Sequence, residues 1–180
     1  EETVTYFVVE SGRHVLDDGT VIEAGKVTGV NAVWQSTLME TPEVVTFSDT
    51  ISNARVFTNT NTDNGGDWQA TRTFDVDDNG FEFALIEEEA DDTGHGTSET
   101  VGWVAVQGGA RFDFETEVVS ADENAVASTI TPDIVGFQSN NAADPAIPRT
   151  DGTDIFTTED RTLDFETSRG KDDIAAIDFK

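Results

Sequence analysis

The stretch that decides the fold runs from residue 74 to residue 86 and reads FDVDDNGFEFALI. Apolar residues alternate with other residues on both sides of an Asn-Gly pair, at Phe74, Val76, Phe81, Phe83 and Leu85. Asn-Gly favours the tight turn of a β-hairpin, and an alternation of period two places one class of side chain on each face of a strand. We therefore expect an antiparallel hairpin here, with one apolar face and one acidic face.

Short runs of β-branched and aromatic residues occur along the rest of the chain, whereas helical periodicity is nearly absent. Turn dipeptides such as Asp18-Gly19, Asn64-Gly65 and Asp151-Gly152 separate several of them. We expect strands at Thr3–Val9, Val44–Phe47, Arg55–Thr60, Thr71–Val76, Phe81–Ile86, Thr100–Val106 and Ile174–Phe179. The predicted fold class is all-β, an antiparallel β-sandwich.

Parts of the sequence repeat. Glu2–Val9 (ETVTYFVV) recurs as Glu99–Val106 (ETVGWVAV), and Asp172–Phe179 (DDIAAIDF) is a fainter copy. Asn64–Thr73 and Asn141–Thr150 share an initial Asn, an Asp three residues later and a final Arg-Thr. We therefore expect two related units in tandem, residues 30–109 and 110–180, after an N-terminal strand and linker at residues 1–29.

The composition restricts the class of partner. Asp and Glu number 37 against 10 Lys and Arg, which gives a formal net charge of −27. Such a surface repels nucleic acid and anionic membranes and attracts cations. The sequence holds no Cys, which excludes disulfides and thiol catalysis, and no apolar run approaches the ~18 residues of a membrane-spanning helix, so we expect no membrane insertion. A start at Glu1-Glu2-Thr3-Val4 is typical of a processed or excised piece of a longer, exported protein.

Four segments, in order, match strands of a known domain: Val45-Thr46-Phe47, Arg55-Val56-Phe57, Asn79-Gly80-Phe81-Glu82-Phe83 and Val101-Gly102-Trp103-Val104-Ala105. Over residues 44–109 the chain resembles the H-type lectin domain and the H-lectin-like modules of hemolysin-type proteins secreted by bacteria. The resemblance implies a sandwich of about six antiparallel strands per unit, trimeric or higher assembly, and a shallow sugar site near subunit contacts.

The matching positions of that family are core positions, namely Phe47, Val56, Phe81, Trp103 and Ala105. They support the fold and say little about binding. Where the animal lectins have an aromatic and polar stretch that helps to form the sugar site, this chain has residues 86–92, IEEEADD. The N-acetylgalactosamine specificity of those lectins is therefore not carried over.

Two acidic segments are candidate calcium sites. In residues 75–80 (DVDDNG), Asp75 and Asp77 match the first half of a calcium loop, but Ile86 stands where a bidentate Glu is needed, and a hairpin turn explains the segment equally well. The second segment is a loop whose crowded carboxylates must be solvated or share a cation. Its candidate ligands are Glu87, Glu88, Asp91, Asp92 and Glu99. Ca²⁺ is the cofactor that these residues suggest, and no organic cofactor is indicated.

The most lectin-like set of residues comprises Asn64, Asp67, Trp68 and Arg72, with His95 from the acidic loop. Sugar sites commonly combine a carboxylate and an Arg for the hydroxyls with an aromatic ring for the apolar face. The alternative is a loop in which Asp67 and Arg72 pair internally and fix the entry to a strand.

The sequence contains no nucleophile elbow, no phosphate-binding glycine loop and no zinc-type His spacing, so we expect no enzyme. Our leading hypothesis is a non-catalytic, calcium-assisted carbohydrate-binding module, extracellular or on the cell surface, with a glycan as partner. The alternative is a structural repeat of an adhesin, surface layer or filament that contacts sister subunits in a homo-oligomer, because a strand ahead of a unit can complete a neighbour. A third hypothesis is a non-catalytic module attached to a polysaccharide-degrading enzyme.

Overall fold

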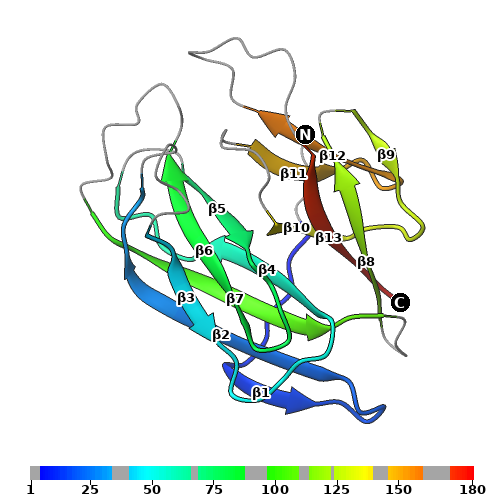
Figure 1. The fold of residues 1–180 in the computed structure, drawn as a ribbon, viewed down its shortest axis with the longest axis horizontal. Coiled ribbons are helices and arrows are strands. Elements are labelled where there is room, and N and C mark those ends of the chain that lie inside the picture. Colours follow the sequence, from blue (N-terminus) through cyan, green and yellow to red (C-terminus); the bar gives the residue numbers. More distant parts are fainter. Residues whose placement is uncertain are drawn as a thin grey trace.

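The computed structural model describes residues 5–33, 41–65, 69–87, 97–109, 114–122, 124–139, 146–159 and 171–180 (Figure 1). All regular elements in these ranges are strands. The described residues contain no helix that is long and apolar enough to cross a membrane. The strands named in the next two paragraphs pair antiparallel. This confirms the predicted all-β, antiparallel fold class.

The first seven strands form one sandwich of two sheets. Sheet A has the order β1-β2-β7-β4 and sheet B the order β3-β6-β5. The strands are β1 (Gly12–Val15), β2 (Val21–Val30), β3 (Glu43–Thr46), β4 (Ala54–Thr60), β5 (Gln69–Phe74), β6 (Gly80–Glu87) and β7 (Glu99–Gln107). Phe47, Phe81, Phe83 and Trp103 fill the space between the sheets, together with aliphatic residues such as Val56.

The last six strands form a second sandwich. Sheet C has the order β10-β13-β8 and sheet D the order β11-β12-β9. The strands are β8 (Phe114–Ala121), β9 (Val126–Ala127), β10 (Ile134–Ser139), β11 (Ala146–Thr150), β12 (Asp154–Glu159) and β13 (Asp172–Phe179). Its core is smaller and centres on Phe137, Ile155 and Ile174.

The two sandwiches have the same strand order once β1 is set aside. In sheet A the last strand, β7, lies between β2 and β4, and in sheet C the last strand, β13, lies between β8 and β10. Sheets B and D also agree, because β3-β6-β5 corresponds to β9-β12-β11. Each set holds six strands, and the two sets meet between Gln107 and Phe114. Both sequence echoes fall on matching strands, β7 with β13 and β5 with β11.

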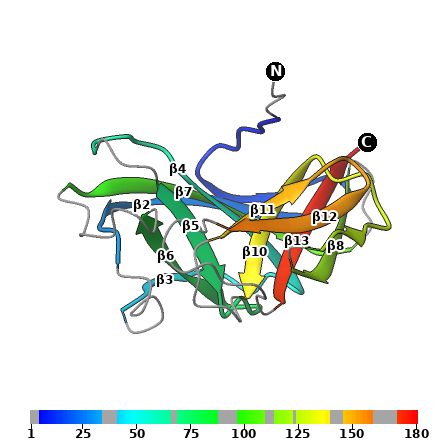
Figure 2. The ribbon, with the colours of Figure 1, turned by 90° about the horizontal axis from the view of Figure 1, so that it is seen from above.

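Sheet A is covered on both faces. Val101, Trp103 and Ala105 of β7 point toward sheet B. The intervening Val104 and Val106 join a different cluster, which includes Ala175 and Ile177 of β13 in sheet C. The sandwiches therefore pack against each other through sheets A and C, as the two views of the ribbon show (Figures 1 and 2).

The hairpin of β5 and β6 forms around Asn79-Gly80, but its faces differ from the predicted ones. Phe74 pairs with Glu82 and therefore lies on the face opposite to Phe81 and Phe83. There it packs in a second apolar cluster with Ala84 and Ile86. The five residues of the connection shift the alternation by one position, so the face predicted to be acidic is partly apolar.

The N-terminal predictions need two corrections. Residues 1–29 are not a separate strand and linker, because β1 and β2 belong to sheet A and β2 pairs along its length with β7. The predicted strand Thr3–Val9 is not found in its described part, because Thr5–Val9 belongs to none of the four sheets. Strand β7, which has the same sequence motif, occupies the central position of sheet A.

Candidate functional site

The contact between the sandwiches includes a strand edge that a side chain completes. Strand β4 lies at the edge of sheet A, so one row of its backbone groups lacks a strand partner. The amide of Gln138 takes that place for Val56: the Val56 N–H donates to Gln138 Oε1 (3.3 Å), and Gln138 Nε2 donates to the Val56 carbonyl (2.8 Å). Gln138 is buried, so this side chain satisfies two buried backbone groups and links the two sandwiches.

A buried ion pair lies in the same contact. Arg72 of β5 has its guanidinium carbon 4.3 Å from the ring centroid of Phe137. Its Nη1 lies 3.7 Å from Oδ2 of Asp172 in β13, and both side chains are fully buried. The sequence pattern around Arg72 predicted a sugar site. In this structure Arg72 has no exposed surface to offer a sugar, and it joins the two sandwiches instead.

A polar pocket opens beside this contact, with a volume of about 250 Å³. We call it the threonine pocket. Its walls come from β4, β5, β10 and β11, and they include Thr58, Asn59, Gln69, Thr71 and Pro148. The Thr58 hydroxyl bonds to those of Thr71 (2.9 Å) and Thr73 (2.8 Å), which links sheets A and B. Gln69 Oε1 is buried without a hydrogen-bond partner among the described residues.

A second pocket, of about 310 Å³, lies on another part of the contact. We call it the arginine pocket, because Arg55 lines it together with Asp75 and Asp173. Burial lowers the pKa of Arg55 from its ordinary value, although an arginine stays protonated in proteins. Arg55 Nη1 donates to the Ala54 carbonyl (3.1 Å), whereas its Nε is buried without a hydrogen-bond partner.

Glu99 holds a loop in place. Its buried carboxylate accepts hydrogen bonds from the Thr62 hydroxyl, from the Asn64 backbone N–H (2.8 Å) and from the Gly65 backbone N–H (3.2 Å). The Asn64 side chain donates to the Ser98 carbonyl (2.9 Å). Asn64 and Glu99, assigned from the sequence to a sugar site and to a metal site, therefore meet in one network that closes the residue 62–65 loop onto β7.

The half-matching calcium loop forms a turn. Asp77 Oδ1 accepts from the backbone N–H groups of Asn79 (2.6 Å) and Gly80 (3.0 Å), and these bonds lower the pKa of Asp77. Asp78 Oδ1 accepts from the Asn53 N–H (2.7 Å). Asp75 has a positive φ of 49° and faces the arginine pocket. Asp75 and Asp77 thus shape a connection between strands, which is the turn alternative left open by the sequence.

The other candidate metal ligands divide between described and undescribed residues. Glu87 ends β6 and is buried. Asp67, Trp68, Glu88, Asp91, Asp92 and His95 lie outside the described residues. Within the part of the chain that is described, no group of three or more His, Asp and Glu side chains is placed to hold a metal ion.

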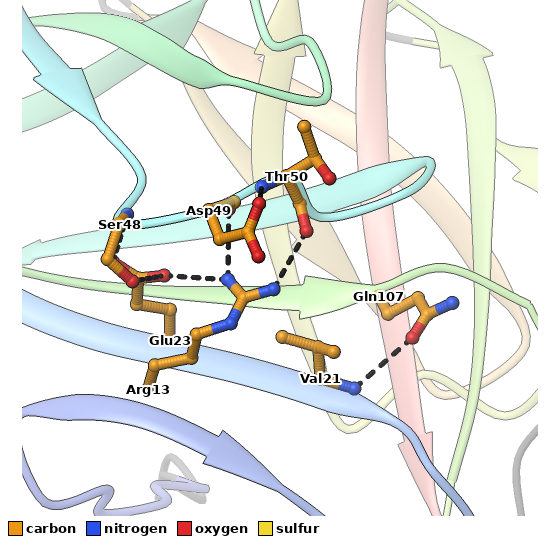
Figure 3. A network of polar contacts seen from close by, with 7 residues as sticks. All are labelled: Arg13, Val21, Glu23, Ser48, Asp49, Thr50 and Gln107. Atoms are coloured by element: carbon orange, nitrogen blue, oxygen red, sulfur yellow. Dashed lines mark hydrogen bonds and ion pairs between the residues drawn. The ribbon is translucent and has the colours of Figure 1, made fainter.

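A network around Glu23 was not predicted from the sequence. This buried carboxylate accepts from Arg13 Nη1 (3.0 Å), the Ser48 N–H (2.8 Å) and the Ser48 hydroxyl (2.9 Å), as Figure 3 shows. Arg13 also donates to the carbonyls of Asp49 (2.9 Å) and Thr50 (2.8 Å). The network holds the β3–β4 connection against β1 and β2. The only signal in the sequence is a single Glu inside a run that otherwise lacks acidic residues.

Comparison with known proteins gives one informative likeness. No family model matches the chain, and no solved structure matches it. The chain is similar to a protein named halomucin from Haloquadratum walsbyi (strain DSM 16790 / HBSQ001), with 32% identity over 132 residues. The matched part covers 71% of this chain and 1% of halomucin, so the chain spans about one hundredth of the length of that relative.

Proposed function

We propose that this chain is a structural building block of a long extracellular or cell-surface protein, in which β-sandwiches of one design are joined in tandem. The observation that supports this most directly is the repeated strand order: β2–β7 and β8–β13 arrange six strands in the same way. Repeat proteins place such units side by side so that neighbours share an interface.

The contact between the sandwiches supports a structural role. The apolar cluster around Phe57, Val106 and Ile177, the Gln138–Val56 bonds and the buried Arg72–Asp172 pair all cross it. Buried and specific contacts of these kinds fix two bodies in one relative position, unlike a flexible linker. A rigid pair is what a spacer needs.

The surroundings of the protein are inferred from two observations. The matched relative is a very long protein with mucin in its name, a word for proteins of extracellular layers. The net charge of −27 favours a protein that stays soluble among cations and away from anionic surfaces. The likeness supports a place outside the cell, and the charge suits surroundings rich in cations.

A carbohydrate-binding role is the second candidate, and the threonine pocket favours it. The pocket combines hydroxyl and amide side chains with Pro148 and Ile147, which suits the polar edge and the apolar face of a sugar ring. Its volume, about 250 Å³, is slightly below the roughly 300–1,000 Å³ of typical ligand sites.

One pair of measurements separates the two proposals. The structural role predicts no saturable binding on a glycan array, with or without Ca²⁺, and one cooperative unfolding transition for both sandwiches. Saturable binding that the double variant Asn59→Ala/Gln69→Ala abolishes would favour the carbohydrate role. Thr28→Ala, which changes an exposed residue of β2 outside the pocket, is the matched control. Two separate transitions would contradict a rigid pair.

A further inference from the structure

Each sandwich ends in the same kind of strand, which we call its closing strand: β7 in the first sandwich and β13 in the second. Aligning ETVGWVAV of β7 with DDIAAIDF of β13 places Val101 opposite Ile174 and Trp103 opposite Ala176, and all four lie in the core of their own sandwich. It also places Val104 opposite Ile177, and both lie in the cluster between the sandwiches. At these positions the two closing strands therefore direct corresponding residues toward the core and toward the contact between the sandwiches. They also occupy corresponding central positions in their sheets.

The same alignment explains two further features. Both closing strands begin with a buried acid, Glu99 and Asp172. Three residues after Val106, the chain turns at Gly109, which has a φ of 111°. The segment Glu2–Val9 begins with an acid in sequence, and three residues after Val9 it reaches Gly12, whose φ is 123°. A φ in this range suits glycine alone, so the exit from the segment matches the exit from β7.

We infer that Thr5–Val9 is a third closing strand. Its partner is a neighbouring sandwich unit of the same design that lacks a closing strand of its own, so that a gap remains between the strands equivalent to β2 and β4. This inference rests on the proposed function. Strand β7 already fills the central position in sheet A, so the first sandwich of this chain has no place for the segment.

The exposure of the segment agrees with this assignment residue by residue. Tyr6 and Val8, which align with the core residues Trp103 and Ala105, are 80% and 86% exposed. Phe7 aligns with Val104, which faces the other sandwich. Its ring contacts Phe57 (6.5 Å between centroids) and Phe179 (5.4 Å). The face that would enter a partner core is thus open, and the opposite face already lies against this molecule.

The segment also has the free edges that insertion needs. It belongs to none of the four sheets, so its backbone is open to pairing with strands on both sides. Figure 2 shows it leading away from the sheets toward the N-terminus. Adding a strand to an open sheet combines main-chain hydrogen bonds with alternate side-chain pockets, and Tyr6 and Val8 supply the side chains.

A fusion tests the inference. A second copy of residues 12–98, which has β1–β6 but no closing strand, is joined in front of residue 2 of the full chain. The junction then reads Ser98-Glu2-Thr3-Val4, in place of the natural Ser98-Glu99-Thr100-Val101. We expect the added copy to fold around Thr5–Val9. It should resist proteolysis, and amide exchange at residues 5–9 should slow at least 100-fold relative to the unfused chain.

Two control fusions make every outcome decisive. Tyr6→Asp/Val8→Asp places charges on the core face and should leave the added copy protease-sensitive. In the other control, residues 2–9 are replaced by ETVGWVAV, which restores the natural closing strand. If that control folds and the native segment does not, the inference is wrong and the tandem proposal stands. If the control also fails to fold, the units are not self-contained, and both are overturned.

Discussion

Buried charged residues in this protein hold strands and loops together. Arg72 and Asp172 pair inside the contact between the sandwiches, while Glu23 and Glu99 each accept several hydrogen bonds from nearby connections. Hydrogen bonds to a charged group are among the stronger ones in proteins, so each of these carboxylates can fasten one segment to another. The acids that matter most for the fold are therefore a small minority of the 37 in the sequence.

Removing one member of the Arg72–Asp172 pair should be costly. Arg72→Met leaves the Asp172 carboxylate buried beside an apolar side chain, and breaking a buried pair in this way costs about 3–5 kcal/mol. We expect that loss in the free energy of unfolding, measured by urea denaturation. Arg149→Met, at the matching position of β11 but exposed, is the control and should change little. Equal effects of the two variants would contradict the importance of the buried pair.

Three turn carboxylates should make the protein sensitive to acid. Backbone N–H bonds lower the pKa of Asp77, Asp122 and Asp151 below the ordinary value of 3.8. Because the folded-state pKa is lower than the unfolded one, the stabilisation is complete above pH 3.8 and is lost as the pH falls through the folded-state values. NMR titration should show all three midpoints below the ordinary value of 3.8. Midpoints at the ordinary value would contradict the turn geometry.

At the scale of elements, the Gln138 side chain, which completes the edge of β4, should contribute more to the free energy of unfolding than a similar glutamine elsewhere. Gln138→Leu leaves the Val56 N–H and carbonyl buried without these partners, and each such group costs about 1–3 kcal/mol. We therefore expect a loss of about 2 kcal/mol or more and faster amide exchange at Val56. Gln107→Leu, whose side chain accepts from the part-buried Val21 N–H (3.2 Å), is the matched control. A loss from Gln138→Leu no larger than that of the control would contradict the edge role.

Trp103 connects β7 to both sheets of the first sandwich. Its ring meets those of Phe81 (5.6 Å) and Phe47 (6.2 Å) and covers Gly25, where an added Cβ would lie 2.6 Å from the indole. Trp103→Ala should cost about 3–5 kcal/mol, as for other buried aromatic residues. Urea denaturation and near-ultraviolet circular dichroism test this. A variant with unchanged stability would show that Trp103 is not a core residue.

The sequence predicted the strands with clear alternation and missed those without it. Strands β3 to β7 and β13 were found because β-branched and aromatic residues dominate them. Strand β2 was missed because Gly25, Lys26 and Gly29 interrupt its pattern, and only the fold shows that Gly25 makes room for Trp103. In β8 the polar and acidic residues between Phe114 and Val118 hid the alternation.

The candidate site was harder to predict than the fold. Gln138 and Val56 are 82 positions apart, and no local pattern connects them. Arg72 was assigned to a sugar site, but its partner Asp172 lies in a different sandwich, which spacing alone does not reveal. The pockets form from the ends of strands that are distant in sequence, so they depend on the packing of the two sandwiches.

At the scale of the whole molecule, charge repulsion should be the main destabilising influence. A net charge of −27 favours expanded states at low ionic strength. The screening length falls from about 30 Å at 0.01 M salt to about 3 Å at 1 M. We expect the melting temperature to rise by several degrees over this range of NaCl. Repeating the melt in CaCl₂ at matched ionic strength separates screening from specific binding. A melting temperature independent of salt would contradict the repulsion argument.

The ring contact between Phe7 and Phe179 has a consequence for how such a protein could grow. Phe7 precedes β1 of the first sandwich and Phe179 ends β13 of the second, yet their rings are 5.4 Å apart. When a chain enters and leaves a pair of sandwiches at nearly the same point, duplication or deletion of the corresponding gene segment can add or remove the whole pair. The neighbouring domains are then little displaced. The number of sandwich pairs can thereby change during evolution while the core of each pair stays the same.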